Sequence, residues 1–296
     1  MKGGPMQKNP RKLLWVLALV GTLGSCAYQG TDITKSFPEF ANGSNPSAYT
    51  WRKKDAYKLL FVGNSFTYYH NLPELVQDMG SAAGLTIACE SVTKGKQTMT
   101  MTADPTDEMG AQLLSTIKAT SDYTDVILQE HSTQPVTNFA AYREGLLAVR
   151  KEIGDYERHA SYHLYGTWGY PGLATTLKTD IPGAEMALRK AFIRMAPYVL
   201  GDVSPVGEAF TYCYLNHPEI NLYYADQHHP SFEGSYLAAL VHLITITHVD
   251  VDAISFLGDG TTDDQGTEQS IDVATAATLK AVAKTITAPY LETIES

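Results

Sequence analysis

One stretch sets the architecture of this chain: KLLFVGNSFTYYHNLPELVQDM, residues 58–79. Its first part, 59–62, is a short apolar run that ends at Gly63, a pattern typical of a fully buried β-strand. Its last part, 72–79, repeats apolar side chains at intervals of three and four residues, which gives an α-helix one apolar face. Pro73 suits the first turn of that helix, where its missing N–H costs nothing. We therefore predict a strand, a sharp turn and a helix.

Ser65 lies in that turn, just past the end of the predicted strand. In open α/β sheets, ligands bind beside the carboxyl ends of the strands, so a serine at this point can contact a substrate. Backbone N–H groups around it can face a negative charge that develops during a reaction. The alternative is a plain helix-capping role. The position makes Ser65 a candidate nucleophile.

The rest of the chain alternates between these two kinds of pattern. Short apolar runs predict further strands around 85–92, 125–129, 161–167 and 203–206. Helical spacing predicts helices within 107–119, 142–153, 184–199, 235–246 and 270–286. The fourth of these helices is so apolar that we expect it to be buried on most sides. Strands that alternate with helices predict a parallel sheet covered on both faces.

Composition and charge exclude several classes of protein. The chain has 296 residues, of which 44% are hydrophobic and 18% charged, and this is ordinary for a globular protein rather than a disordered or fibrous one. Residues 51–296 suffice for one α/β domain with a well-filled core. The net charge is −10, and the four cations and no acids of residues 1–25 leave −14 for the remainder. Because phosphate binding needs a basic face, we expect no nucleic-acid partner.

Residues 1–26 are predicted to be a targeting segment. Basic residues precede the apolar run 13–23, which is too short to span a bilayer as a stable helix. The run ends in small residues and Cys26, which resembles a bacterial lipoprotein signal, where that cysteine is acylated and becomes the mature amino terminus. A plain secretory signal with an incidental Cys26 is the alternative. The resemblance implies a lipid anchor on Cys26 and an extracytoplasmic location, on the periplasmic or cell-surface side of a membrane.

Residues 27–50 are rich in Gly, Ser, Asn, Pro and Thr, which suits a flexible tether that holds the domain 51–296 off a membrane. Two further cysteines, Cys89 and Cys213, follow in the domain. The sequence leaves open whether they pair in an oxidising compartment or remain two buried thiols.

A base for the serine is predicted near the carboxyl terminus. A serine hydroxyl is a poor nucleophile at neutral pH and needs a base within hydrogen-bond reach, which is itself oriented by a third group. Asp226 and His229 are three residues apart, so a single turn can present both side chains to one point. His229 would take the proton from Ser65, and Asp226 would hold the imidazole tautomer and stabilise its cation. The neighbouring His228 is expected to point elsewhere.

These two motifs together resemble the SGNH (GDSL-type) hydrolase superfamily, in its lipoprotein-like esterase branch. GNSFT, residues 63–67, follows a buried strand as the first block of that family does, with Asn64 where aspartate is more usual. DQHHPS, residues 226–231, matches the last block. The resemblance spans residues 57–248 in order. It implies a flavodoxin-like three-layer α/β/α sandwich with a central parallel sheet of about five strands, and ester hydrolysis through an acyl-serine with no cofactor.

The resemblance also implies an oxyanion hole with three donors. Ser65 supplies the first, its own N–H. Gly95 follows the second predicted strand and is the natural second donor. The usual Gly-x-Asn-Asp run of the third block is absent, and Gln129 ends the third strand at the corresponding place. Its amide can donate as an asparagine does, one methylene further out, so Gln129 is the expected third donor.

The other polar and aromatic residues near these motifs have alternative interpretations. Asp226, His228 and His229 form a cluster that suits a metal, with a further ligand from His131 or Glu130, although we predict no metal site. Ser132, beside these last two, is expected to be a polar strand-end residue. Tyrosines 68, 69, 223 and 224 are expected to pack rather than to form a platform for sugars. Trp168 and Tyr170 end the fourth strand, where they can line a pocket.

The sequence as a whole favours a serine esterase on the extracytoplasmic side of a membrane. The expected substrate is a small-molecule or glycan ester, and the hypothesis we prefer is removal of O-acetyl groups from carbohydrate. It depends on the lipoprotein-like start and on the lack of a long apolar lid segment of the kind a lipase uses. Two alternatives remain: a catalytically silent glycan-binding lipoprotein of the same fold, and a metal-dependent hydrolase that uses the histidine cluster.

Overall fold

The computed structural model describes residues 51–120, 122–262 and 267–295. The predicted signal peptide, the predicted tether and Cys26 lie outside the described residues.

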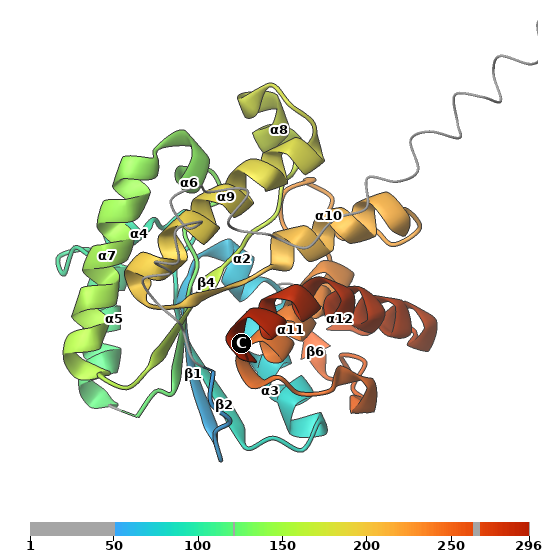
Figure 1. Ribbon diagram of the computed structural model, residues 1–296, viewed down its shortest axis with the longest axis horizontal. Helices are drawn as coiled ribbons and strands as arrows, with labels where there is room; N and C mark the ends of the chain where they lie inside the picture. Colours follow the sequence, from blue (N-terminus) through green and yellow to red (C-terminus); the bar gives the residue numbers. More distant parts are fainter. Residues whose placement is uncertain (1–50, 121, 263–266, 296) are drawn as a thin grey trace, which may run out of the picture.

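A parallel sheet of five strands forms the centre of the molecule (Figure 1). The strands are β1 (Tyr57–Gly63), β2 (Ile87–Thr93), β3 (Asp125–Leu128), β4 (Ser161–Tyr165) and β5 (Asp202–Ser204). Their order across the sheet is β2-β1-β3-β4-β5, and every neighbouring pair is parallel. The order reverses between β1 and β3, so a crevice for ligands is expected at the carboxyl ends of these two strands. The predicted fold class, a three-layer α/β/α sandwich, is confirmed.

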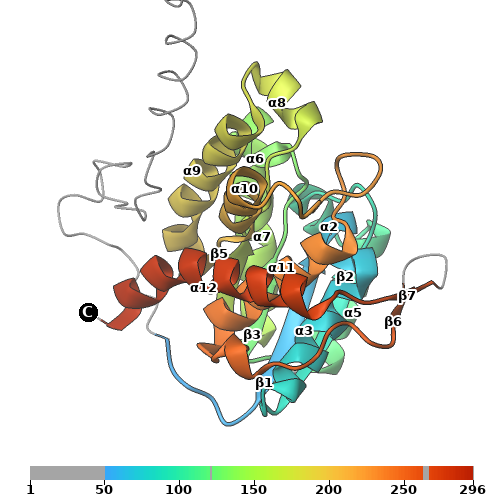
Figure 2. The same cartoon turned by 90° about the vertical axis from the view of Figure 1, so that its right-hand side faces the viewer.

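Helices cover both faces of the sheet, and the two views in Figures 1 and 2 separate the two layers. One layer holds α3 (Leu72–Ala82), α11 (Phe232–Thr247) and α12 (Val273–Glu295). The other holds α5 (Glu108–Ala119), α7 (Phe139–Tyr156) and α9 (Ile181–Val199), and α10 (Val206–Asn216) packs against both α9 and α11. The predicted helices all appear, and all of them except α11 have one apolar face.

Short elements connect the layers, and most of them lie outside the sequence predictions. They are α2 (Ser65–Tyr68), η3 (Tyr69–Asn71), α4 (Met99–Thr102), α6 (Gln134–Thr137), α8 (Pro171–Leu177), η4 (Val251–Ala253), β6 (Thr261–Thr262) and β7 (Glu268–Gln269). Elements this short bury too few side chains to leave a periodic pattern.

Helix α11 is buried along almost its entire length, as predicted. Nearly every side chain from Phe232 to Thr247 is buried. The reason is that α11 lies between α3 and α12 and makes its most extensive contacts with these two helices. A helix enclosed in this way needs apolar residues on all sides, which accounts for its lack of an amphipathic pattern.

A buried charged cluster ties together the amino-terminal parts of three strands. His163 in β4 lies between Asp125 of β3 and Asp202 of β5, with Nδ1 at 2.5 Å from Asp202 Oδ1 and Nε2 at 3.0 Å from Asp125 Oδ1. Lys54 Nζ lies 2.6 Å from Asp125 Oδ1. Burial alone would lower the pKa of His163, but the two carboxylates outweigh it and raise the pKa to about 9. His163 is therefore an imidazolium at neutral pH.

The two domain cysteines are separate thiols. Cys89 is half-buried on β2 and Cys213 is buried in α10. Of the two possibilities that the sequence left open, the structure therefore shows the unpaired one. Among the described residues, we also find no helix with the length and apolar character needed to cross a bilayer.

Candidate active site

The sharp turn after β1 places Ser65 at the first position of α2. Asn64 caps this helix, since its Oδ1 accepts a hydrogen bond from the N–H of Phe66 at 3.3 Å. Gly63 is required just before it, because a Cβ at this position would lie 2.5 Å from both Gln129 Oε1 and Thr67 Oγ1. The predicted strand and helix are present as β1 and α3, while the predicted turn contains the short helix α2, which begins at Ser65 on the carboxyl edge of the sheet.

His229 and Asp226 meet Ser65 at this edge. His229 Nε2 lies 2.9 Å from Ser65 Oγ, and His229 Nδ1 lies 2.6 Å from Asp226 Oδ2. In the tautomer that fits both contacts, Nδ1–H donates to the carboxylate and Nε2 accepts from the serine hydroxyl. The structure thus brings together all three residues of the predicted constellation, from positions that are 164 residues apart in the chain.

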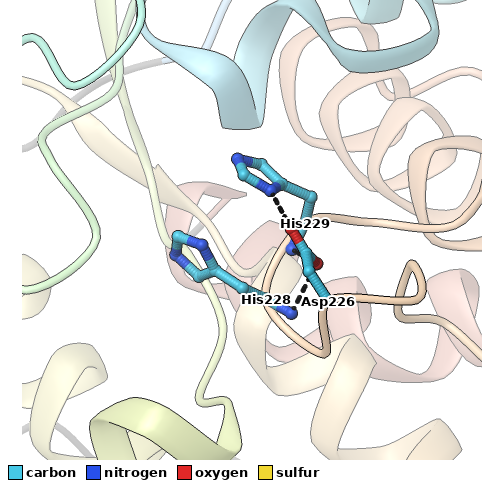
Figure 3. Close-up of side chains that lie close together, drawn as sticks. All are labelled: Asp226, His228 and His229. Carbon is cyan, nitrogen blue, oxygen red and sulfur yellow. Dashed lines mark hydrogen bonds and ion pairs between the residues drawn. The ribbon is translucent and has the colours of Figure 1, made fainter.

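A tight turn holds the histidine and aspartate in place. Asp226 Oδ1 accepts hydrogen bonds from the backbone N–H groups of His228 and His229, each at 3.0 Å. Its Oδ2 accepts a hydrogen bond from His229 Nδ1 (Figure 3). Burial tends to raise the pKa of Asp226, but the hydrogen bonds from His229 and these N–H groups outweigh it and lower the pKa. Asp226 is therefore ionised, which is the state that orients an imidazole base.

Gly95, the expected second oxyanion donor, lies in a tight turn beside α2. The turn closes where the N–H of Gln97 donates to the carbonyl of Lys94 at 3.3 Å, and Lys96 has a φ of +63°. The hydroxyl of Tyr68, in α2, lies 3.2 Å from the place where a Cβ on Gly95 would stand. The N–H of Gly95 has no hydrogen-bond acceptor within the described part of the chain. It is accordingly still a candidate donor.

Gln129 does not fit the role of third donor, and this prediction is corrected. Its Nε2 donates to Asn64 Oδ1 at 2.9 Å and to the carbonyl of Glu130 at 2.5 Å, so both amide hydrogens are in use. Its Oε1 accepts the N–H of Asn64 at 2.7 Å and the hydroxyl of Thr67 at 3.0 Å. The side chain is 1% exposed. Gln129 therefore links the end of β3 to the Ser65 turn through hydrogen bonds.

The same network explains why asparagine stands where the SGNH motif usually has aspartate. Asn64 Nδ2 donates to the carbonyl of Gln97 at 3.0 Å, while its Oδ1 accepts from Phe66 and Gln129. A carboxylate has no hydrogen to donate to that carbonyl. Asn64 thus links the Ser65 turn to the Gly95 turn.

We expect Asn64→Asp to lower the free energy of unfolding by about 1–3 kcal/mol at pH 7, because a buried carboxylate would face the carbonyl of Gln97 without a donor. The loss should shrink in acid, where a protonated carboxyl group can donate. Urea denaturation at several pH values measures both effects. The matched control is Asn216→Asp, which removes an exposed amide bond to the carbonyl of Tyr212. An equal loss in both variants, or no recovery in acid, would contradict the prediction.

A second hydrogen-bonded group lies beside Ser65, His229 and Asp226, and the sequence analysis did not predict it. His228 Nε2 lies 3.3 Å from Ser132 Oγ, which in turn lies 3.1 Å from the hydroxyl of Tyr170. The ring of Tyr170 packs against His228 with centroids 4.3 Å apart. Burial lowers the pKa of His228 to about 4, so this imidazole is neutral. The signal available in the sequence was the polar run at the end of the third strand.

Aromatic residues support the site from beneath and line its rim. Trp168 is fully buried and stacks on Phe66 with ring centroids 4.2 Å apart, so it lies under the site. The prediction that Trp168 lines a pocket is therefore wrong. Tyr223 is also buried, and its hydroxyl donates to the carbonyl of Gly169 at 2.7 Å. Tyr68 and Tyr224, in contrast, are 37% and 47% exposed. The expectation that the tyrosines pack is right for Tyr223, while Tyr68 and Tyr224 both contact the ring of Tyr69 and remain partly exposed.

Glu130 is buried and bound to the backbone. Its carboxylate accepts the N–H of Met99 at 3.1 Å and the N–H of His131 at 2.6 Å. Burial raises its pKa to about 7. These contacts hold the segment after the Gly95 turn against the end of β3 and remove Glu130 from the set of possible metal ligands.

Asp226, His228 and His229 are also the group that best suits a metal ion. One ligand atom from each residue lies within 4.8 Å of the others (Figure 3). Asp226, however, uses both oxygens for hydrogen bonds within the turn, so a metal would have to displace His229 from the carboxylate. The arrangement fits a serine–histidine–aspartate constellation better than a metal centre.

Comparison with known proteins supports the resemblance. No protein-family model and no curated protein matches the chain. Among solved structures, a candidate SGNH hydrolase from Slackia heliotrinireducens has 26% sequence identity and a TM-score of 0.51, over 64% of this chain and 97% of that one. A DUF4886 family protein from Bacteroides uniformis shares the fold at 17% identity and a TM-score of 0.65, over 80% of this chain and 96% of that one. The likeness to the Slackia structure, together with the strand order and the contact between Ser65 and His229, supports the assignment of this chain to the SGNH hydrolase superfamily.

Proposed function

We propose that the protein is a serine esterase that works through an acyl-enzyme on Ser65. The observation that carries the proposal is the continuous hydrogen-bonded chain from Ser65 Oγ to His229 Nε2, at 2.9 Å, and from His229 Nδ1 to Asp226 Oδ2, at 2.6 Å. A nucleophile, a base and an orienting carboxylate at these distances are the requirement for acyl transfer by serine.

The chemistry follows from the positions of the three groups. Ser65 Oγ attacks the ester carbonyl while its proton passes to His229 Nε2, and Asp226 stabilises the imidazolium that forms. The N–H groups of Ser65 and Gly95 are the proposed donors to the oxyanion. The imidazolium then gives its proton to the leaving alcohol as the tetrahedral intermediate collapses to acyl-Ser65. Water, deprotonated by His229, attacks the acyl group, the carboxylic acid product leaves, and the imidazolium returns its proton to Ser65 Oγ.

For the substrate, we propose O-acetyl groups on glycans. The site is open at its rim, where the Asp226 side chain is 43% exposed and two tyrosine rings, of Tyr68 and Tyr224, face solvent. Exposed aromatic rings beside a nucleophile can contact the apolar face of a sugar. The lipoprotein-like start adds support, since a lipid on Cys26 would hold the enzyme at an extracytoplasmic surface. We include this anchor and location in the proposal.

A fluorophosphonate probe and two ester substrates test the proposal. We expect the probe to label the protein covalently and Ser65→Ala to abolish labelling and hydrolysis of p-nitrophenyl acetate. Acetylated xylo-oligosaccharides should be hydrolysed faster than long-chain p-nitrophenyl esters. Chelator-sensitive hydrolysis without labelling would instead favour the metal-dependent alternative. The observation that favours this alternative is the proximity of Asp226, His228 and His229. Glycan binding without labelling or hydrolysis would favour the catalytically silent alternative.

A further inference from the structure

The imidazole of His229 is covered by the ring of Tyr69. The two rings are parallel, with an angle of 3° between their planes and 4.2 Å between their centroids. Ser65 and Asp226 contact the nitrogen atoms at the edge of the imidazole, while Tyr69 covers one of its faces. The ring of Phe66 meets the imidazole at 80°, with centroids 5.9 Å apart. The other titratable group beside it is the neutral imidazole of His228, whose centroid lies 4.6 Å away with 54° between the ring planes.

An unusual backbone segment keeps Tyr69 over the histidine. The next two residues, His70 and Asn71, have φ values of +51° and +47°, in the left-handed region that residues other than glycine seldom adopt. His70 is buried, and its Nδ1 lies 2.8 Å from Ser235 Oγ of α11. The core therefore maintains a strained turn directly after Tyr69. Strain of this kind persists where the surroundings enforce it and often accompanies a functional site.

The charge that develops on His229 gives the stack a chemical role. In the proposed reaction, the imidazole becomes a cation when it takes the proton of Ser65. Its partner Asp226 is 43% exposed, so water weakens the attraction between this carboxylate and the cation. The face of an aromatic ring carries partial negative charge and attracts a cation that lies over it. The Tyr69 ring lies where it can stabilise the imidazolium, and there it also excludes water from that face.

We propose that Tyr69 is a positioning residue that fixes the His229 ring and stabilises its charged form. The proposal rests on the proposed function. It explains why the strained turn is retained, because relaxation of His70 and Asn71 would move the Tyr69 ring away from the imidazole. The proposed role of Tyr69 is exerted through the ring of His229, on which it is stacked.

The test compares Tyr69→Leu, which removes the aromatic face, with Tyr69→Phe, which keeps it. For Tyr69→Leu we expect kcat to fall about three- to tenfold and the acid limb of the kcat/KM profile to move down by about half to one pH unit. The direction follows because the variant loses the attraction between the ring face and the imidazolium, which favours the charged form over the neutral one. Tyr69→Phe should behave like the parent protein.

The direction of the shift separates this role from simple packing. If Tyr69 only kept His229 in place, its removal would admit water, solvate the cation and move the acid limb upward. An upward or absent shift in Tyr69→Leu, or an equal effect of Tyr69→Phe, would overturn the proposal. Tyr156→Leu is the matched control, because this tyrosine is 41% exposed at the end of α7 and has no part in the site. It should leave the acid limb unchanged.

A measurement without turnover distinguishes failure of this inference from failure of the proposed function. The ring protons of His229 can be titrated by NMR in the full chain, for the parent protein and for Tyr69→Leu. A lower midpoint in Tyr69→Leu supports the role of the stack even if no ester is hydrolysed. An unchanged midpoint in a protein that hydrolyses esters overturns the role of Tyr69 and leaves the esterase proposal standing.

Discussion

Replacing His229 by alanine is expected to lower ester turnover by at least about 10⁴-fold, because Ser65 would lose the base that accepts its proton. The contact at issue is the 2.9 Å separation between His229 Nε2 and Ser65 Oγ. The fold should survive, since the histidine lies on a turn at the surface and its side chain is 19% exposed. Turnover of p-nitrophenyl acetate by folded protein measures the loss, with circular dichroism as the check on folding.

The adjacent histidine provides a control one residue away. His228 has a neutral imidazole whose Nε2 contacts Ser132, so His228→Ala should stay within about tenfold of the parent turnover. Asp226→Asn should also lower turnover by about 10⁴-fold, because an amide favours the wrong tautomer of His229. A protein that tolerates His229→Ala but not His228→Ala would have a different base, and the proposed constellation would be abandoned.

The largest expected effect on stability comes from His163→Leu. This change leaves the carboxylates of Asp125 and Asp202 without the imidazolium that lies between them, and Asp125 is fully buried. Loss of one partner from a buried ion pair costs about 3–5 kcal/mol of folding free energy. Urea denaturation at pH 7 measures the loss. Turnover per folded molecule should stay unchanged, because the cluster lies toward the amino ends of the strands, away from Ser65.

The pH dependence of this effect has a defined sign. The pKa of His163 is raised from 6.5 to about 9 in the folded protein, so its contribution is fully present below pH 6.5 and is lost as the pH rises through about 9. The difference in unfolding free energy between the parent and His163→Leu should therefore narrow above pH 9. Adding Asp202→Asn to His163→Leu should recover part of the loss. A difference that stays constant from pH 6 to pH 10 would show that the imidazolium is not its source.

Local periodicity was enough to predict most of the fold. The apolar run of β1 and the helical spacing after Pro73 each depend on residues that are neighbours in sequence, and both appear as predicted. The continuous burial of α11 also follows from composition alone. Ser65, Asp226 and His229 were predicted as a group because two short motifs in the right order determine which sheet edge each occupies.

The remaining features depend on contacts between distant strands, which no local pattern encodes. Gln129 was predicted to be an oxyanion donor, but its amide donates a hydrogen bond to Asn64, which is 65 residues away in the chain. The position of His163 between two aspartates follows from the register of β3, β4 and β5. Tyr69 stacks on His229 directly before two left-handed residues, His70 and Asn71, and neither of these belongs to a periodic segment.

The burial of α11 affects how the catalytic site unfolds. The turn that holds Asp226 and His229 runs directly into this helix at Phe232, and Ser65 follows the interior strand β1. Both halves of the site are thus joined to segments whose amides are expected to exchange with solvent most slowly, through global opening alone. Fraying of loops or of chain ends would leave the two halves together, so the catalytic group should persist as one cooperative unit until the whole domain melts.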